Sequence, residues 1–179
     1  MNARQVREIL DFWFSRGWDE WWKADPDFDA EISKRFETLW AEQRENVPEH
    51  FLGSAEEALA AVLLFDQFPR NMFRGHADQF STDPLALAIA KGAIERGHDD
   101  GMTSAQRGFL YMPFEHSEDL PDQRQSLLLF TALGNAEHLK YARKHYEVIE
   151  RFGRFPHRNV MLGRKPTALE EAAGDVAPW

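Results

Sequence analysis

Three short segments combine charged side chains with aromatic ones, and they hold the residues whose types and spacing could do chemistry. They are FDQFPRNMFRG at residues 65–75, RGFLYMPFEHSED at residues 107–119 and RFGRFPHRN at residues 151–159. Buried polar groups are costly unless they satisfy one another. We therefore expect the three segments to converge on one groove, around a cavity that could hold a ligand.

The first segment places a carboxylate in register with an apolar helix face. Asp66 follows Val62 and Leu63 by four and three positions, a spacing that brings side chains onto one side of a helix. Because an unpaired buried charge is strongly destabilising, we expect Asp66 to be buried and paired with Arg70, with Arg74 or with an arginine of another helix. The alternative is an ion pair that fastens the helix end and does no chemistry.

The second segment has the densest group of polar side chains. Arg107, Tyr111 and Glu115 recur at intervals of four, so they share one helix face if the helix continues past Pro113. Glu115 beside His116 could serve as a general acid or base, but the spacing is not that of a helical zinc motif, and no metal site is predicted. The alternative is that these side chains cap and turn the chain before the next helix.

The third segment surrounds phenylalanines with basic groups. Arg158 could offer its guanidinium fork to an anion, with His157 and Asn159 on either side. The alternative is a surface loop whose phenyl rings close the core.

Two functional hypotheses follow. The first is a binding module that holds a small anionic ligand or an acidic peptide in an arginine-containing groove. Its predicted ligand-binding residues are Arg70, Asn71, Arg74, Arg107, Tyr111, Glu115, His116, His157, Arg158 and Asn159. The second is a hydrolase that uses Asp66 or Glu115 as a base with His116 or His157 as its acid–base partner. The sequence has no GxSxG, phosphate-loop or HExxH motif, which favours binding, and it indicates no cofactor.

The composition limits the class of protein. The chain has 179 residues, of which 43% are hydrophobic, and it contains no cysteine, so disulfides, thiolate zinc sites and cysteine nucleophiles are excluded. We expect a cytoplasmic protein. A net charge of -9 disfavours nucleic acid as a partner, and the longest apolar run, residues 58–65, is too short to span a membrane. The oligomeric state is not indicated.

Helix punctuation recurs along the whole sequence and predicts an all-α fold. The expected helices begin and end at Asn2 and Gly17, Asp25 and Trp40, Ser54 and residues 66–70, Asp83 and Gly97, Thr103 and Pro113, Leu120 and Gly134, and Asn135 and Gly153. Pro113 is expected to shorten or kink the fifth. A last short helix starts at Thr167, and we expect poor order within residues 164–179.

These elements favour one domain over residues 1–179, built of about seven helices packed as antiparallel hairpins in an array or bundle. Five aromatic side chains of the first two helices should form one buried cluster: Trp13, Phe14, Phe28, Phe36 and Trp40.

Four ordered strings make the sequence recognisable: ILDFWF at 9–14, LFDQFPRNMFRG at 64–75, FLYMPFEHSEDLPDQ at 109–123 and ERFGRFPHRNVMLGR at 150–164. They resemble a bacterial family of uncharacterised proteins, the domain of unknown function family 924. The resemblance implies a helical fold similar to tetratricopeptide-repeat proteins, and it implies no activity, substrate or cofactor. The sequence departs from the pattern at Lys165-Pro166-Thr167, where such chains carry a Ser-Thr type helix cap.

Overall fold

The computed structural model of the chain describes residues 1–174 and residue 176, and the chain is helical throughout this part, without a strand. The α-helices are α1 Ala3–Phe14, α2 Trp18–Trp21, α3 Pro26–Gln43, α4 Ala55–Val62, α5 Phe68–Met72, α6 Asp83–Glu95, α7 Ser104–His116, α8 Leu120–Leu133, α9 Ala136–Phe152 and α10 Ala168–Ala173. Four short segments join them: η1 Pro48–Phe51, the π-helical η2 Leu63–Gln67, η3 Ala77–Phe80 and η4 Pro156–Arg158. The predicted all-α fold class is confirmed.

The helix ends follow the capping signals of the sequence. Asn2 and Thr103 form capping boxes that begin α1 and α7, and the Asp25 carboxylate caps α3. Gly134 and Gly153 end α8 and α9 with φ values of 73° and 70°, a left-handed conformation that glycine adopts without strain. The local sequence therefore determines most of the helix boundaries.

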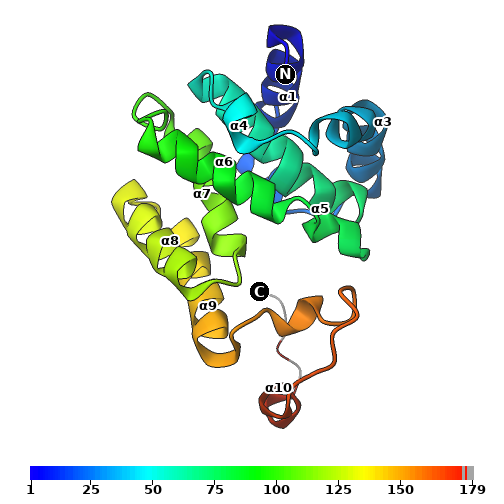
Figure 1. Cartoon of the computed structure of the whole chain (residues 1–179), viewed down its shortest axis with the longest axis vertical. Coiled ribbons are helices and arrows are strands. Elements are labelled where there is room, and N and C mark those ends of the chain that lie inside the picture. The colour runs from blue at the N-terminus through cyan, green and yellow to red at the C-terminus, as the bar shows by residue number, and fades with distance from the viewer. Residues whose placement is uncertain (175, 177–179) are drawn as a thin grey trace.

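Neighbouring helices pack side by side through the molecule (Figure 1). Contacts run from α1 to α4, then to α6, α7, α8 and α9, while α3 packs on α5. Only Gly134 and Asn135 separate α8 from α9, so these two contacting helices must run antiparallel. No helix within residues 1–174 has the length and apolar character needed to cross a bilayer.

The N-terminal aromatic side chains lie in the core but do not form one group of rings. Trp13 stacks on Phe28 with ring centroids 6.0 Å apart, and Phe12 bridges Phe28 and Phe36 at 5.5 and 5.2 Å. Trp40 instead contacts Phe73, at 4.9 Å, and Phe14 contacts Phe109, at 5.8 Å. The prediction of buried Trp13, Phe28, Phe36 and Trp40 is confirmed, whereas the single cluster is wrong, because α3 is long enough to separate its two ends.

The third predicted helix does not end near residues 66–70 but continues to Met72 through the π-helical turn η2. Pro69 has no N–H to donate to the preceding turn. The carbonyl of Phe65, four residues earlier, accepts a hydrogen bond from the hydroxyl of Thr82 instead, at 2.7 Å. This bond fixes Thr82 and therefore the neighbouring Asp83 against the π-helical turn.

Pro113 does not shorten α7, which reaches His116. The end of the helix is held by Gln123, a fully buried side chain of α8. Its amide donates to the backbone carbonyls of Glu115 and Ser117, each at 2.7 Å. Because these carbonyls lack partners within the helix, Gln123 fixes the backbone that carries Glu115 and His116.

The predicted helix at Thr167 is present as α10, and its Glu170 is buried. Arg154 pairs with the Glu170 carboxylate at 2.7 Å, which packs residues 167–173 against the third sequence segment. The expectation of poor order in 164–179 is wrong for these residues, because a buried ion pair ties them down. Its remainder, residues 175 and 177–179, lies outside the described residues.

Candidate functional site

Asp66, on the π-helical turn η2, is completely enclosed by protein. Its carboxylate accepts hydrogen bonds from Nδ1 of His116, at 2.7 Å, and from the side-chain amide of Gln67. Nη1 of Arg70 lies 3.5 Å from the same carboxylate oxygen. The prediction that Asp66 is buried and paired with an arginine is confirmed. Such π-helical turns occur frequently at functional sites.

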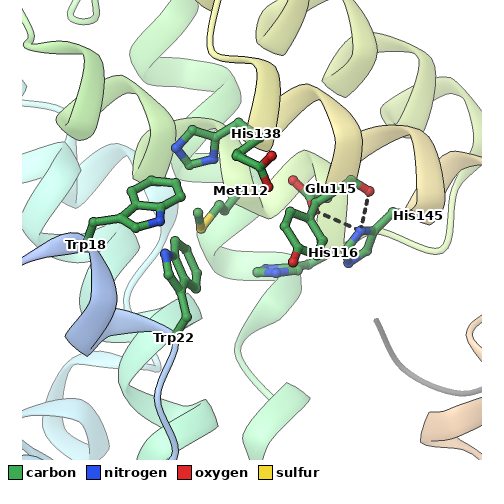
Figure 2. A pocket seen from close by; sticks show the side chains of 9 residues that line it. Trp18, Trp22, Met112, Glu115, His116, His138 and His145 are labelled. Atoms are coloured by element: carbon green, nitrogen blue, oxygen red, sulfur yellow. Dashed lines mark hydrogen bonds and ion pairs between the residues drawn. The ribbon is translucent and has the colours of Figure 1, made fainter.

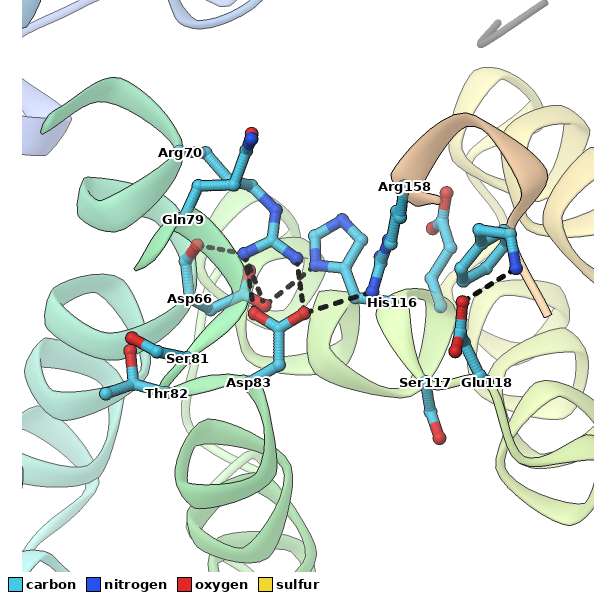
Figure 3. Close-up of polar contacts among 12 residues, drawn as sticks. Asp66, Arg70, Gln79, Ser81, Thr82, Asp83, His116, Ser117, Glu118 and Arg158 are labelled. Carbon is cyan, nitrogen blue, oxygen red and sulfur yellow. Dashed lines mark hydrogen bonds and ion pairs between the residues drawn. The ribbon is translucent and has the colours of Figure 1, made fainter. Parts of the chain in front are cut away.

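Asp83 connects the first sequence segment to the third (Figure 3). Arg70 donates two hydrogen bonds to its carboxylate, at 2.9 and 3.0 Å, and Arg158 donates one, at 3.3 Å. The guanidinium of Arg158 also lies between the rings of Phe80 and Phe155, 4.5 Å from each centroid. Both arginines are therefore largely neutralised by carboxylates of the protein.

The network sets the protonation of its members. Burial alone would raise the pKa of Asp66, but Arg70 and His116 outweigh it and lower that pKa to about 2. Burial, followed by the charge of Arg70, lowers the pKa of His116 below its usual 6.5. At neutral pH Asp66 is thus ionised and His116 neutral, with the proton on Nδ1 and a lone pair on Nε2. Within the described chain, Nε2 has no hydrogen-bond partner.

A pocket of about 390 Å³ opens beside His116, between α2 on one side and α7 and α9 on the other (Figure 2). We call it the aromatic–histidine pocket; its lining is Trp18, Trp22, Met112, Glu115, His116, Glu137, His138, Tyr141 and His145. The indoles of Trp18 and Trp22 are 41% and 48% exposed, and their ring centroids lie 5.4 Å apart. Small-molecule sites typically have volumes of roughly 300–1,000 Å³, so a small ligand fits here.

Two histidines of α9 face the pocket. Nδ1 of His145 lies 2.8 Å from the carboxylate of Glu115. The ring of His138 is 6% exposed, packs against Trp18 with centroids 5.0 Å apart, and has no hydrogen-bond partner within the described chain. Gly108 allows this ring to approach α7, because a Cβ at that position would lie 2.9 Å from Nε2 of His138. The pocket thus contains an imidazole that the protein itself leaves unpaired.

A second pocket, of about 290 Å³, lies on the other side of His116. Its lining is Phe80, Asp83, Pro84, Leu87, Pro113, His116, Ser117, Glu118, Arg158 and Leu162. Nε of Arg158 is buried and has no acceptor among the described residues. Burial and the charge of Arg70 lower the pKa of Arg158 to about 10. His116 is therefore shared by two pockets of different chemistry.

The three sequence segments do meet, through the residues of the buried network. These are Asp66, Arg70, His116 and Arg158. Asn71 and Arg74 lie elsewhere, because both bind Asp29 on α3, at 2.8 and 2.9 Å. Tyr111 donates to Asp99 at 2.6 Å, and Arg107, nine residues before His116, lies about 13 Å from it along the helix axis. These four predicted residues line neither pocket.

The other predicted residues are divided between the pocket and the C-terminal segment. Glu115 lines the aromatic–histidine pocket. The ring of His157 packs on Phe155, and burial followed by the charge of Arg158 lowers its pKa to about 4. Asn159 donates to Glu170 at 3.2 Å and holds α10 rather than a pocket. Among residues 1–174 and 176, no group of three or more His, Asp or Glu side chains is placed to hold a metal ion.

A family model described as a bacterial protein of unknown function, DUF924, matches residues 9–173. The chain belongs to this family. A solved structure of a protein of unknown function from Agrobacterium tumefaciens, ATU0120, is 42% identical, with a TM-score of 0.88 over 96% of this chain and 97% of that one. Among curated proteins none matches. The family predicted from the four sequence strings is confirmed, and neither of these relatives carries a described activity.

Sequence reasoning on this DUF924 chain misses Trp18, Trp22, Asp83 and the two histidines of α9. The signal for the histidines is present: His138 and His145 share the buried face of α9 with Ala142, at intervals of four and three. Imidazoles on such a face require a polar environment, which indicates a site. Asp83 gives no comparable signal, because Asp-Pro also marks an ordinary helix start.

Proposed function

We propose that the protein is a binding module whose small organic ligand occupies the aromatic–histidine pocket. The observation that carries the proposal is His138, whose enclosed ring lines the pocket without a hydrogen-bond partner in the described chain. An unsatisfied buried polar group costs about 1–3 kcal/mol, and a ligand that bonds to it removes that cost. The indoles of Trp18 and Trp22 supply broad apolar surfaces for the body of the ligand.

A thermal-shift screen of small amines, carboxylic acids and aromatic alcohols tests this proposal. A ligand at 100 times its Kd adds about 2.7 kcal/mol to the free energy of unfolding, which raises the melting temperature measurably. Hits should bind Trp22→Leu and His138→Ala at least about tenfold more weakly, a loss of about 1.4 kcal/mol. Leu128→Ala, an exposed apolar side chain on α8, is the control. Equal affinities for all variants would overturn the proposal.

An anionic ligand or acidic peptide, as the sequence predicts, finds support only at the second pocket. Arg70 and Arg74 already have carboxylate partners, whereas Nε of Arg158 is a buried donor without an acceptor in the described chain. We expect inorganic phosphate to raise the melting temperature and Arg158→Gln to abolish that rise. An equal rise in both proteins would place the anion elsewhere.

A second candidate function is hydrolysis, favoured by the 2.7 Å contact between Asp66 and Nδ1 of His116. A carboxylate that orients an imidazole in this way leaves Nε2 available as a general base. Nε2 would accept a proton from water, the hydroxide would attack an acyl carbon, and the imidazolium would return the proton to the leaving group. Of the predicted pairs, only Asp66 with His116 has this geometry, because Glu115 pairs with His145.

Hydrolysis of p-nitrophenyl acetate tests this candidate. General-base catalysis is worth about 10²–10⁴-fold in rate, so His116→Gln should lower kcat/KM by at least about 100-fold. His76→Gln, an exposed histidine outside both pockets, should leave the rate unchanged. A wild-type rate no higher than that of free imidazole at the same concentration would exclude the hydrolase.

A further inference from the structure

The charged groups that line the aromatic–histidine pocket are carboxylates, with no lysine or arginine among them. Glu137 is exposed at the rim, 3.4 Å from Lys140. Glu115 is enclosed: one carboxylate oxygen faces His145, and the other has no hydrogen-bond partner within the described chain. Lys140 and Lys144 lie outside, 5.6 and 5.2 Å from the ring of Tyr141, and their exposure to solvent screens their charge. The enclosed part of the pocket therefore has a negative charge.

The polar atoms of this pocket are mainly hydrogen-bond acceptors. Because Nδ1 of His116 donates to Asp66, its Nε2 can only accept when the ring is neutral. The second oxygen of Glu115 also accepts, and a neutral His138 ring offers one acceptor nitrogen. A ligand that satisfies these atoms must therefore bring N–H or O–H donors.

The indole rings of Trp18 and Trp22 form the opposite wall (Figure 2). Their faces carry negative potential and attract organic cations, and tryptophan is the strongest of the aromatic side chains in this respect. Met112 lies at the base of the pocket and contributes apolar contact. Aromatic faces and a carboxylate in one small pocket are complementary to a positively charged head on an apolar body.

From these observations we infer that the ligand of the aromatic–histidine pocket is a small organic ammonium ion, bound by Glu115 and the two tryptophans. The inference rests on the proposed function, and it specifies the charge and the donor group of the ligand. It differs from the anionic ligand that the sequence predicts, because the arginines behind that prediction are paired with carboxylates of the protein.

Three probes of similar shape test the inference: 2-phenylethylammonium, phenylacetate and 2-phenylethanol. Binding is measured by isothermal titration and by the fluorescence of Trp18 and Trp22. A hydrogen bond to a charged group is worth about 1.5–3 kcal/mol, so the ammonium should bind at least about tenfold more tightly than the alcohol and the carboxylate. Glu115→Gln should reduce this preference to within about threefold while leaving the affinity for 2-phenylethanol unchanged.

Glu147→Gln is the matched control, because it removes the same charge from an exposed position of α9 outside the pocket. Retained binding of 2-phenylethanol by Glu115→Gln shows that this variant is folded. If phenylacetate or the alcohol binds as tightly as the ammonium, the charge assignment is overturned while the binding module stands. If none of the three binds with a Kd below about 10 mM, both proposals fail.

Discussion

Replacing Asp66 by Asn tests the buried network at its centre. The amide has nearly the same shape and can still accept from His116, now 2.7 Å from the carboxylate, but the charge that faces Arg70 at 3.5 Å is lost. Removing one partner of a buried ion pair costs about 3–5 kcal/mol. Since Arg70 keeps its two bonds to Asp83, we expect a loss near 3 kcal/mol, the lower end of that range.

For a chain of this length about 1 kcal/mol corresponds to 2–4 °C, so the melting temperature should fall by roughly 6–12 °C. Urea unfolding followed by circular dichroism at pH 7 measures the free energy directly. Asp11→Asn, an exposed aspartate of α1, is the control and should change the stability by less than about 0.5 kcal/mol.

The pH dependence gives a second test of the same variant. The pKa of Asp66 is about 2 in the folded protein against 3.8 ordinarily, so the group contributes stability above pH 3.8 that is lost as the pH falls towards 2. The difference corresponds to about 2 kcal/mol. The stability gap between wild type and Asp66→Asn should therefore narrow from pH 5 to pH 2. A loss below about 1 kcal/mol at pH 7, or a gap that stays constant in acid, would refute the reasoning.

Three further variants test other parts of the structure. Gly108→Ala should not raise the melting temperature despite the better helix propensity of alanine, because the new Cβ would lie 2.9 Å from Nε2 of His138; a clear rise would contradict this contact. The pKa of His157 is about 4, so it contributes stability above pH 6.5 that is lost towards pH 4; His157→Gln should flatten the fall of the urea midpoint over that interval, and parallel curves would contradict the assignment. Trp40→Ala should cost about 3–5 kcal/mol in urea unfolding, and a loss below about 1 kcal/mol would mean that the side chain is not in the core.

Much of the fold can be predicted because its signals are local. Asn2, Asp25 and Thr103 begin their helices by hydrogen bonds within three residues, and glycine at 134 and 153 ends two others. The continuation past Pro69 cannot be predicted in this way, since it depends on a hydroxyl donated by Thr82, thirteen residues later.

The candidate site is less predictable, because pairing between distant charges decides it. The burial of Asp66 follows from its register with the apolar face of its helix. The sequence does not indicate that Asp83 neutralises Arg70 and Arg158, or that Asp29 holds Arg74. Each arginine has several carboxylates of similar sequence separation, and only the packing of the helices selects one of them.

The central claim is that His116 and His138 present unpaired ring nitrogens to a ligand in the aromatic–histidine pocket. Long-range proton–nitrogen NMR of the histidine rings, with and without 2-phenylethylammonium, tests it most directly. We expect the His116 proton on Nδ1 before addition, and shifts of its Nε2 and of a His138 nitrogen on addition, with the exposed His50 and His76 unchanged. A His116 proton on Nε2, or equal shifts in all four rings, would contradict the account.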